Sequence, residues 1–293
     1  MEEIKNDKYW IRQQDNLEFM KELEDKSIGL IYGVGSIHKT NEGFEIKIIN
    51  KPSVRKREIV FLDEYKFKKI VYTHAIQKGA IKNPYKPNVA GVGFFGEGDF
   101  FAENDIKYST WKNIIIRSND MRYKKENLSY INTSVDIFWH NYQNFAKWHM
   151  ENFPYNIKNI KFEVDKDLLQ FNKKNKIYSK DTCIFLPHSV NSYLKIFSMD
   201  KKLKKTKNNS YTIRYTPFLK KRTQKTFKTK KEAVSFFNNF LLNQFDRIVD
   251  YLISLNYLNK DKIEKIISQK HHQMREIQYS TVLQGVIQRA KLQ

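Results

Sequence analysis

The centre of the chain reads Val164-Asp165-Lys166-Asp167-Leu168-Leu169 and, after a short gap, Asn175-Lys176-Ile177-Tyr178-Ser179-Lys180-Asp181-Thr182-Cys183. The first segment has the pattern of a short strand that ends in a pair of carboxylates. A tight loop rich in Asn and Lys follows. Ser179 then stands where the pattern predicts the first residue of a helix. This order predicts a ββα unit within residues 160–195, with its helix beginning near Ser179.

Charge is the second informative feature of the chain. Its 293 residues include 53 Lys and Arg against 32 Asp and Glu, which gives a net charge of +21. Such an imbalance predicts a polyanionic partner, and nucleic acid is the usual one. The single cysteine, Cys183, excludes an internal disulfide and a four-cysteine zinc site. It fits a reducing cytoplasm.

Neither a membrane span nor a signal peptide is expected. No run of about 18 apolar residues occurs. The first residues, MEEIKNDKYW, lack the apolar core of a signal peptide. We therefore expect a cytoplasmic protein without a membrane partner.

Hydrophobic periodicity predicts an α+β protein built from several modules. The stretch 82–87 contains two prolines and is expected to be a linker. The expected parts are an N-terminal helix at 1–27, a small β domain of four to five strands at 28–82, a ββα region with flanking helices at 88–195, a basic sheet-and-helix module at 196–247 and a helical tail at 248–293.

A glycine-rich run at 91–98 precedes the ββα region. Four glycines in eight residues are compatible with a loop that cradles phosphate, but no Gly-Lys-Ser/Thr follows them. Glu97 and Asp99 would also repel a phosphate. We therefore expect a structural hairpin here.

The ββα pattern places candidate catalytic groups close together. Asp165 has the position of a carboxylate that holds Mg²⁺ or Mn²⁺, and Thr182 or Asp181 that of a further ligand. Lys166 occupies the position of the general base. A lysine base would need a pKa far below its ordinary value of about 10.4. His188 is an alternative base if the chain folds back toward Asp165.

A structural interpretation of the same residues remains open. Asp165, Asp167, Asn175 and Ser179 are also the residue types that cap helices and close turns. In that case they would hold a ββα scaffold together without chemistry.

Residues 195–231 form the most basic segment, with fourteen Lys and Arg against one acid, Asp200. Strand patterns at 210–215 and 223–227 precede Thr229, which with Glu232 forms a capping box at the start of a helix. An exposed strand face with Lys and Arg at alternate positions would suit a DNA groove. A merely solvated charged face is the alternative. The candidate nucleic-acid-binding residues are Arg214, Lys220, Lys221, Arg222, Lys225 and Lys228.

The chain resembles a group of bacteriophage and prophage proteins related to HNH homing endonucleases. The resemblance rests on the two central segments and on three further motifs: Gly91-Val92-Gly93-Phe94-Phe95-Gly96-Glu97-Gly98, Tyr108-Ser109-Thr110-Trp111-Lys112-Asn113 and Trp139-His140-Asn141-Tyr142-Gln143-Asn144-Phe145-Ala146-Lys147-Trp148. It covers roughly residues 28–245. Many members of this group carry a C-terminal Apetala-type module, a three-stranded sheet packed on one helix.

Carried over by position, the resemblance implies that Asp165 is a metal ligand and that residues 178–183 begin the site helix. It also implies that residues 210–245 form the groove-reading module. Lys166 replaces the catalytic histidine, Lys180 a proline and Asp181 a glutamate, and the Gly and Trp signature of the module is missing. The resemblance therefore implies DNA binding more firmly than cleavage.

These observations predict a phage-type DNA-binding protein with an HNH-like, degenerate nuclease centre, acting in the cytoplasm of a bacterial host. One alternative is an active Mg²⁺-dependent endonuclease that uses Asp165 and Asp181. Another is a phage factor that binds and inhibits a host protein acting on nucleic acid. Double-stranded DNA is the expected partner, and RNA remains an alternative.

Overall fold

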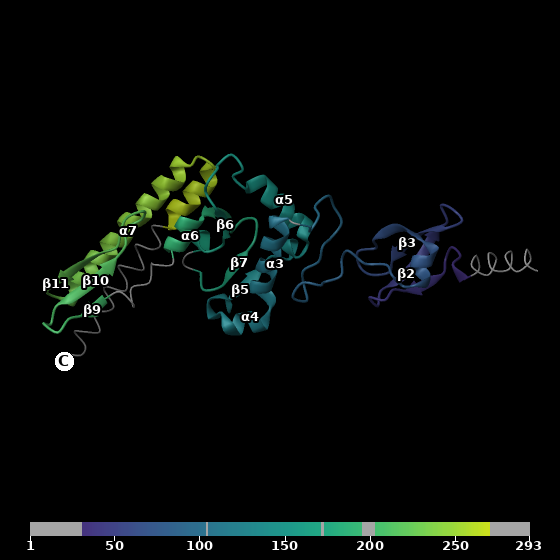
Figure 1. The fold of residues 1–293 in the computed structure, drawn as a ribbon, viewed down its shortest axis with the longest axis horizontal. Helices are drawn as coiled ribbons and strands as arrows, with labels where there is room; N and C mark the ends of the chain where they lie inside the picture. The colour runs from purple at the N-terminus through teal and green to yellow at the C-terminus, as the bar shows by residue number, and fades with distance from the viewer. Residues whose placement is uncertain (1–30, 104, 171–172, 195–202, 270–293) are drawn as a thin grey trace, which may run out of the picture. The chain divides into compact units, whose positions relative to one another are not determined.

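The computed structural model describes residues 31–103, 105–170, 173–194 and 203–269 (Figure 1). Helices alternate with several small sheets, so the protein is of the mixed α+β type. The described residues divide into two compact units, with the border between residues 86 and 87. The expected helix at 1–27 and the end of the expected tail, from 270 on, lie outside the described residues.

The N-terminal unit is an antiparallel meander in the order β1-β2-β3-β4. Its strands are β1 (Ile37–Lys39), β2 (Glu45–Asn50), β3 (Lys56–Phe61) and β4 (Lys68–Tyr72), followed by the short helix α2 (Thr73–Gln77). Strand alternation places one side of each strand inward. The buried side chains of the unit include Ile46, Ile48, Ile59 and Phe61. The four strands of this unit thus form one antiparallel sheet within residues 37–72.

A buried arginine closes one end of this sheet. Arg57 is 1% exposed. Its Nε donates to the carbonyl of Tyr32 at 2.7 Å, and its Nη1 donates to the carbonyls of Ser53, Val54 and Lys56. Within the described part of the chain, no carboxylate forms an ion pair with it. The guanidinium therefore ties the β2–β3 loop to the segment before β1 through backbone carbonyls.

The second unit begins with an aromatic core. Its elements are α3 (Ile106–Asn119), α4 (Met121–Glu126), η1 (Leu128–Tyr130), β5 (Thr133–Val135), η2 (Ile137–His140) and α5 (Tyr142–Asn152). α3 and α4 are separate helices, because Asp120 is extended and its carboxylate caps α4 by accepting from the N–H groups of Arg122 and Tyr123. Trp111, Trp139 and Phe145 are fully buried between these elements.

The glycine-rich run is a structural loop packed on the start of α5. Gly96 has φ +76°, and a Cβ at this position would collide with the side chain of Asn141, the N-cap of α5. Gln143 fixes the run: its Oε1 accepts from Phe100 N at 3.0 Å, and its Nε2 donates to the carbonyls of Phe95 and Phe100. The structural interpretation of residues 91–98 therefore fits these contacts.

A buried histidine lies at the end of α5. His149 stacks on Phe153, with 5.2 Å between ring centroids, and meets Phe145 and Phe185 edge-on. Its Nδ1 has no hydrogen-bond partner among the described residues. Burial lowers the pKa of His149 to about 4. The ring is therefore neutral in the folded protein at pH 7.

This pKa predicts acid sensitivity. The unfolded chain binds a proton at His149 below about pH 6.5, whereas the folded chain does so only near pH 4. Stability should therefore fall by about 2 kcal/mol between pH 7 and pH 5 through this residue. His149→Phe should remove that part of the loss, as judged by urea unfolding at both pH values. An unchanged pH profile in the variant would contradict the assignment.

The centre of the second unit differs from the expected helix start. β6 (Phe162–Asp165) is followed by η3 (Leu168–Gln170) and β7 (Lys176–Tyr178), then by β8 (Ile184–Pro187) and α6 (His188–Leu194). β6 pairs with β8 in antiparallel register, and β7 pairs with β5 in parallel. α6 packs on β6 and β8, so these three elements form a ββα unit.

The prediction of a helix starting near Ser179 was wrong. Residues 179–182 form a turn in which Ser179 Oγ accepts from Thr182 N, and Thr182 Oγ1 accepts from Ser179 N. The buried segment that follows forms strand β8 (Ile184–Pro187), and the helix begins only at His188. The serine therefore closes a turn instead of capping a helix.

The C-terminal module is a three-stranded antiparallel sheet covered by one long helix. Its strands are β9 (Leu203–Lys205), β10 (Tyr211–Tyr215) and β11 (Thr223–Phe227), in the order β11-β10-β9. α7 (Lys230–Ser254) lies along the sheet (Figure 1). The capping box of Thr229 and Glu232 is confirmed.

The expected border at 247–248 falls inside α7, which runs through it without a break. A further helical segment occupies residues 260–269. No helix among the residues described is long and apolar enough to cross a membrane.

Candidate functional site

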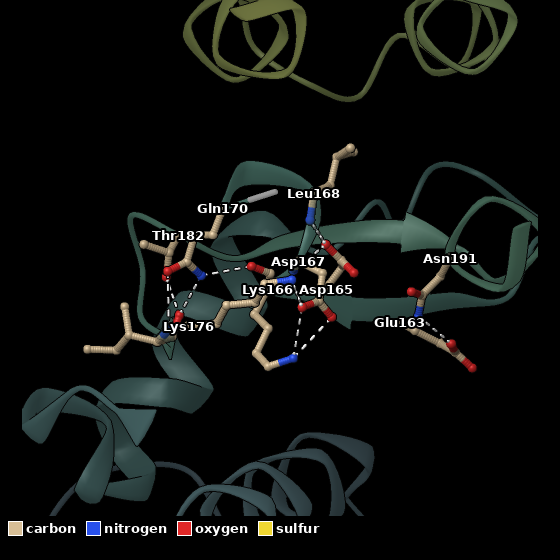
Figure 2. Close-up of polar contacts among 10 residues, drawn as sticks. Glu163, Asp165, Lys166, Asp167, Leu168, Gln170, Lys176, Thr182 and Asn191 are labelled. Atoms are coloured by element: carbon tan, nitrogen blue, oxygen red, sulfur yellow. Dashed lines mark hydrogen bonds and ion pairs between the residues drawn. The ribbon is translucent and has the colours of Figure 1, made fainter. Parts of the chain in front are cut away.

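Asp165 is the buried anchor of the turn after β6. Asp165 is only 4% exposed. Its Oδ2 accepts from Asp167 N at 2.8 Å and from Leu168 N at 2.7 Å (Figure 2). Burial raises the pKa of Asp165 to about 6, and the nearby charge of Asp167 adds to this effect. The carboxylate thus supports the first turn of η3.

Lys166 is also buried, and its ammonium group is held on several sides. Nζ donates to both carboxylate oxygens of Asp167, at 3.1 and 3.0 Å. It lies over the rings of Tyr130 and Tyr178, 5.1 and 5.3 Å from their centroids. Asp167 also accepts from Lys176 Nζ at 2.7 Å. The Lys166 ammonium is thus engaged by one carboxylate and two ring faces.

The surroundings of Asp167 and Gln170 complete the turn. Burial would raise the pKa of Asp167, but the ammonium groups of Lys166 and Lys176 outweigh it and hold that pKa below its usual range. Gln170, 2% exposed, donates to the carbonyls of Lys166 and Ile177 and accepts from Ile177 N. Sequence reasoning missed Gln170, because a single glutamine after a strand carries no distinctive signal.

The two further candidate ligands lie in the turn before β8. Thr182 Oγ1 donates to the carbonyl of Ile177 at 2.6 Å, and Asp181 is exposed. Within the described residues, no group of three or more His, Cys, Asp and Glu side chains could hold a metal ion. Asp165 already accepts two backbone N–H groups and lies next to a lysine. This donor set does not fit Mg²⁺ or Mn²⁺, and a metal centre stays a sequence prediction.

His188 is placed at the opposite end of the β6–β8 ribbon from Asp165. In the register, Asp165 pairs with Ile184, whereas Phe162 pairs with Pro187, the residue before His188. Three strand steps separate the two ends by roughly 10 Å. The geometry therefore does not bring His188 to Asp165 as a displaced base.

His188 instead belongs to an exposed polar cluster on α6. Its Nδ1 lies 2.8 Å from Glu163 Oε1, and its Nε2 lies 3.3 Å from Ser192 Oγ. Glu163 Oε2 accepts from Asn191 Nδ2 at 2.9 Å, and Figure 2 shows this pair apart from the group around Asp165. Burial would raise the pKa of Glu163, but the hydrogen bonds from His188 and Asn191 outweigh it and lower that pKa. The cluster fastens α6 to β6.

The sheet of the C-terminal module has one face on α7 and one open face. Ile213, 1% exposed, lies in the core with Phe237 and Leu241. The neighbours of Ile213 along β10 point to the other side. The register then defines the open face as Lys204, Thr212, Arg214, Gln224 and Thr226. Arg214 is exposed, as predicted.

Lys225 does not share that face. It pairs with Ile213 and therefore lies on the helix side of the sheet. Its Nζ lies over the rings of Phe236 and Phe227, 4.8 and 5.7 Å from their centroids. Arg214 and Lys225 therefore lie on opposite faces of the sheet, because the antiparallel register pairs Arg214 with Gln224 and Lys225 with Ile213.

The remaining predicted cations lie at the borders of the sheet. Lys220, Lys221 and Arg222 are exposed in the β10–β11 loop, and Lys228 is exposed before α7. Phe218 at the root of this loop is buried, and its N–H donates to Gln244 Oε1 at 2.7 Å. The start of the basic loop is therefore anchored to α7 through Phe218 and Gln244.

Comparisons of the chain with protein-family models, with curated proteins and with solved structures found no match. The resemblance to phage proteins related to HNH homing endonucleases therefore stays a prediction from the motifs.

Proposed function

We propose that the protein binds double-stranded DNA through its C-terminal module. The open face of the β9–β11 sheet would enter a groove, and the basic loop from Lys220 to Arg222 would contact the phosphate backbone. The observation that carries this proposal is the character of the open face. Its five side chains are polar or basic, with no apolar and no acidic group among them, and the loop beside it carries three consecutive cations.

Charge and chemistry support a duplex partner. Lys and Arg side chains that neutralise phosphates release counterions, which gives strong but salt-sensitive affinity. The hydroxyls of Thr212 and Thr226 lie 3.0 Å apart on the open face, and Gln224 lies opposite Arg214. Such groups can donate to and accept from base edges, whereas most of the cations contact only the backbone. We therefore propose binding that tolerates many sequences.

The centre at Asp165 supports binding without cleavage. Asp165 caps a turn, and Lys166 pairs with Asp167 between two tyrosine rings. Both residues are therefore engaged in holding the turn that follows β6. Incubation of plasmid DNA with Mg²⁺ or Mn²⁺ tests this point, and nicking by the wild-type protein would contradict it.

The duplex proposal predicts a large effect of the basic loop. Replacing Lys220, Lys221 and Arg222 together with alanine should weaken duplex binding at least about tenfold near 100 mM salt, because backbone contacts supply most of the affinity. The slope of the logarithm of the binding constant against the logarithm of the salt concentration should become less negative by about 2 to 3. A gel shift titrated with salt measures both quantities.

A matched control separates this effect from net charge. Lys51, Arg55 and Lys69 are two lysines and one arginine that are exposed in the N-terminal unit. Their triple alanine variant carries the same change in charge and should keep duplex affinity within about twofold of wild type. Equal losses in the two triple variants would overturn the assignment of the loop, and no shift by the wild-type protein would overturn the proposed function.

A further inference from the structure

We infer that a groove between α7 and the end of β10 binds unpaired nucleotides of a single strand. The groove has a volume of about 560 Å³. It lies on the helix side of the module, opposite the open face of the sheet. Sites for molecules of nucleotide size commonly enclose roughly 300–1,000 Å³. Lys220 is common to this groove and to the basic loop proposed for duplex binding. The aromatic wall and the α7 side chains of the groove lie on the other side of the module from the open face, so variants of these residues test the groove separately.

Three aromatic side chains line the groove. The ring of Tyr215 lies 5.3 Å from that of Phe236 and 4.7 Å from that of Phe240, centroid to centroid. Bases of every kind stack on such rings, so an aromatic wall binds single strands with little choice of sequence. Lys225, placed over Phe236, adds a cation beside this wall.

Polar groups line the side of the groove formed by α7. Asn239, Asn243 and Arg247 recur every fourth residue, so they follow one another along a single helix face. All three are exposed, and Lys220 approaches from the β10–β11 loop. No Asp or Glu is among the described residues that line the groove.

This combination fits a nucleotide better than a neutral ligand. The two amides can donate to and accept from a base edge, while Lys220 and Arg247 can bind the phosphates on either side. Gln244 lies at the base of the groove, where its Oε1 accepts from Phe218 N and from the hydroxyl of Tyr193. Those hydrogen bonds hold the loop that carries Lys220 against α7.

The test uses fluorescence anisotropy of the full chain with labelled oligo-dT, oligo-U and a labelled duplex. Arg247→Glu combined with Asn243→Glu should weaken binding of the single strands at least about tenfold, because it places carboxylates where phosphate should lie. Binding of the duplex should stay within about twofold. Comparison of oligo-dT with oligo-U shows whether DNA or RNA is preferred.

Matched variants keep the inference falsifiable. Lys231→Glu makes the same change of charge as Arg247→Glu at an exposed position on α7 outside the groove, and it should keep single-strand binding. Arg247→Gln removes the positive charge without adding a carboxylate, and it should still weaken single-strand binding if the glutamates of the double variant disturb folding. An equal loss of single-strand affinity in Lys231→Glu would overturn the assignment of the groove, and so would the absence of single-strand binding by the wild-type protein.

The two proposals fail separately. Single-strand binding without any duplex binding would leave the groove assigned and refute the open face. If the protein binds duplex and the groove variants leave single-strand affinity unchanged, the groove is refuted and the open face stays assigned.

Discussion

Replacing Arg57 with methionine is expected to lower the free energy of unfolding of the N-terminal unit by about 3 kcal/mol or more. The guanidinium donates to four backbone carbonyls, and methionine can donate to none of them. The segment at Tyr32 and the β2–β3 loop would therefore lose their common partner. Urea unfolding followed by far-ultraviolet circular dichroism measures the change.

The neighbouring Arg55 provides the control. Arg55 is exposed, so Arg55→Met makes the same chemical change in solvent and should alter stability by less than about 0.5 kcal/mol. Arg57→Lys should lie between the two, because one ammonium cannot reproduce the fork of donors that reaches Tyr32 and the loop together. Similar stabilities for Arg57→Met and Arg55→Met would refute the structural role of the buried guanidinium.

Replacing Asp165 with alanine should destabilise the second unit by about 2 to 4 kcal/mol. The substitution leaves the N–H groups of Asp167 and Leu168 without their acceptor, and Leu168 is fully buried. Asp165→Asn keeps an acceptor oxygen in the same place and should cost less than about 1 kcal/mol. Thermal and urea unfolding of the two variants at pH 7 distinguish them.

The same carboxyl predicts a pH dependence of opposite sign to that of His149. The pKa of Asp165 is about 6 in the folded protein, whereas the ordinary value for an aspartate, as in the unfolded chain, is 3.8. The folded state therefore binds the proton more strongly, and wild type should gain stability relative to Asp165→Asn as pH falls from 6.5 to 4. A constant difference between the two proteins over this range would show that the carboxyl does not titrate as described.

These expectations change the design of any cleavage experiment. Loss of nicking in Asp165→Ala could follow from partial unfolding alone. Asp165→Asn removes the charge that a metal ion would need while keeping the turn, so it separates chemistry from stability.

Local patterns predicted much of the fold. The strands of the N-terminal meander and the capping box of Thr229 and Glu232 both follow from short-range periodicity and capping preferences. Ser179 was misassigned because Ser followed by Asp and Thr closes a turn as readily as it starts a helix. Only the tertiary pairing of β8 with β6 decides between these outcomes.

The candidate sites depended on contacts that the sequence does not display. Periodicity alone could not place Lys225, because the face of a strand residue depends on which residue it pairs with across the sheet. The separation of His188 from Asp165 is likewise a matter of strand register. Gln244 and Gln170 act through hydrogen bonds to distant backbone atoms, and no local motif marks such residues.

The buried amide of Phe218 offers a kinetic reporter for the basic loop. Its N–H donates to Gln244, whereas the next four residues of the loop are exposed. Hydrogen exchange at Phe218 should therefore require local opening of the loop from α7, and be much slower than exchange at Lys221. A loop anchored in this way loses less conformational entropy on binding, so its cations should contribute affinity without a slow folding step.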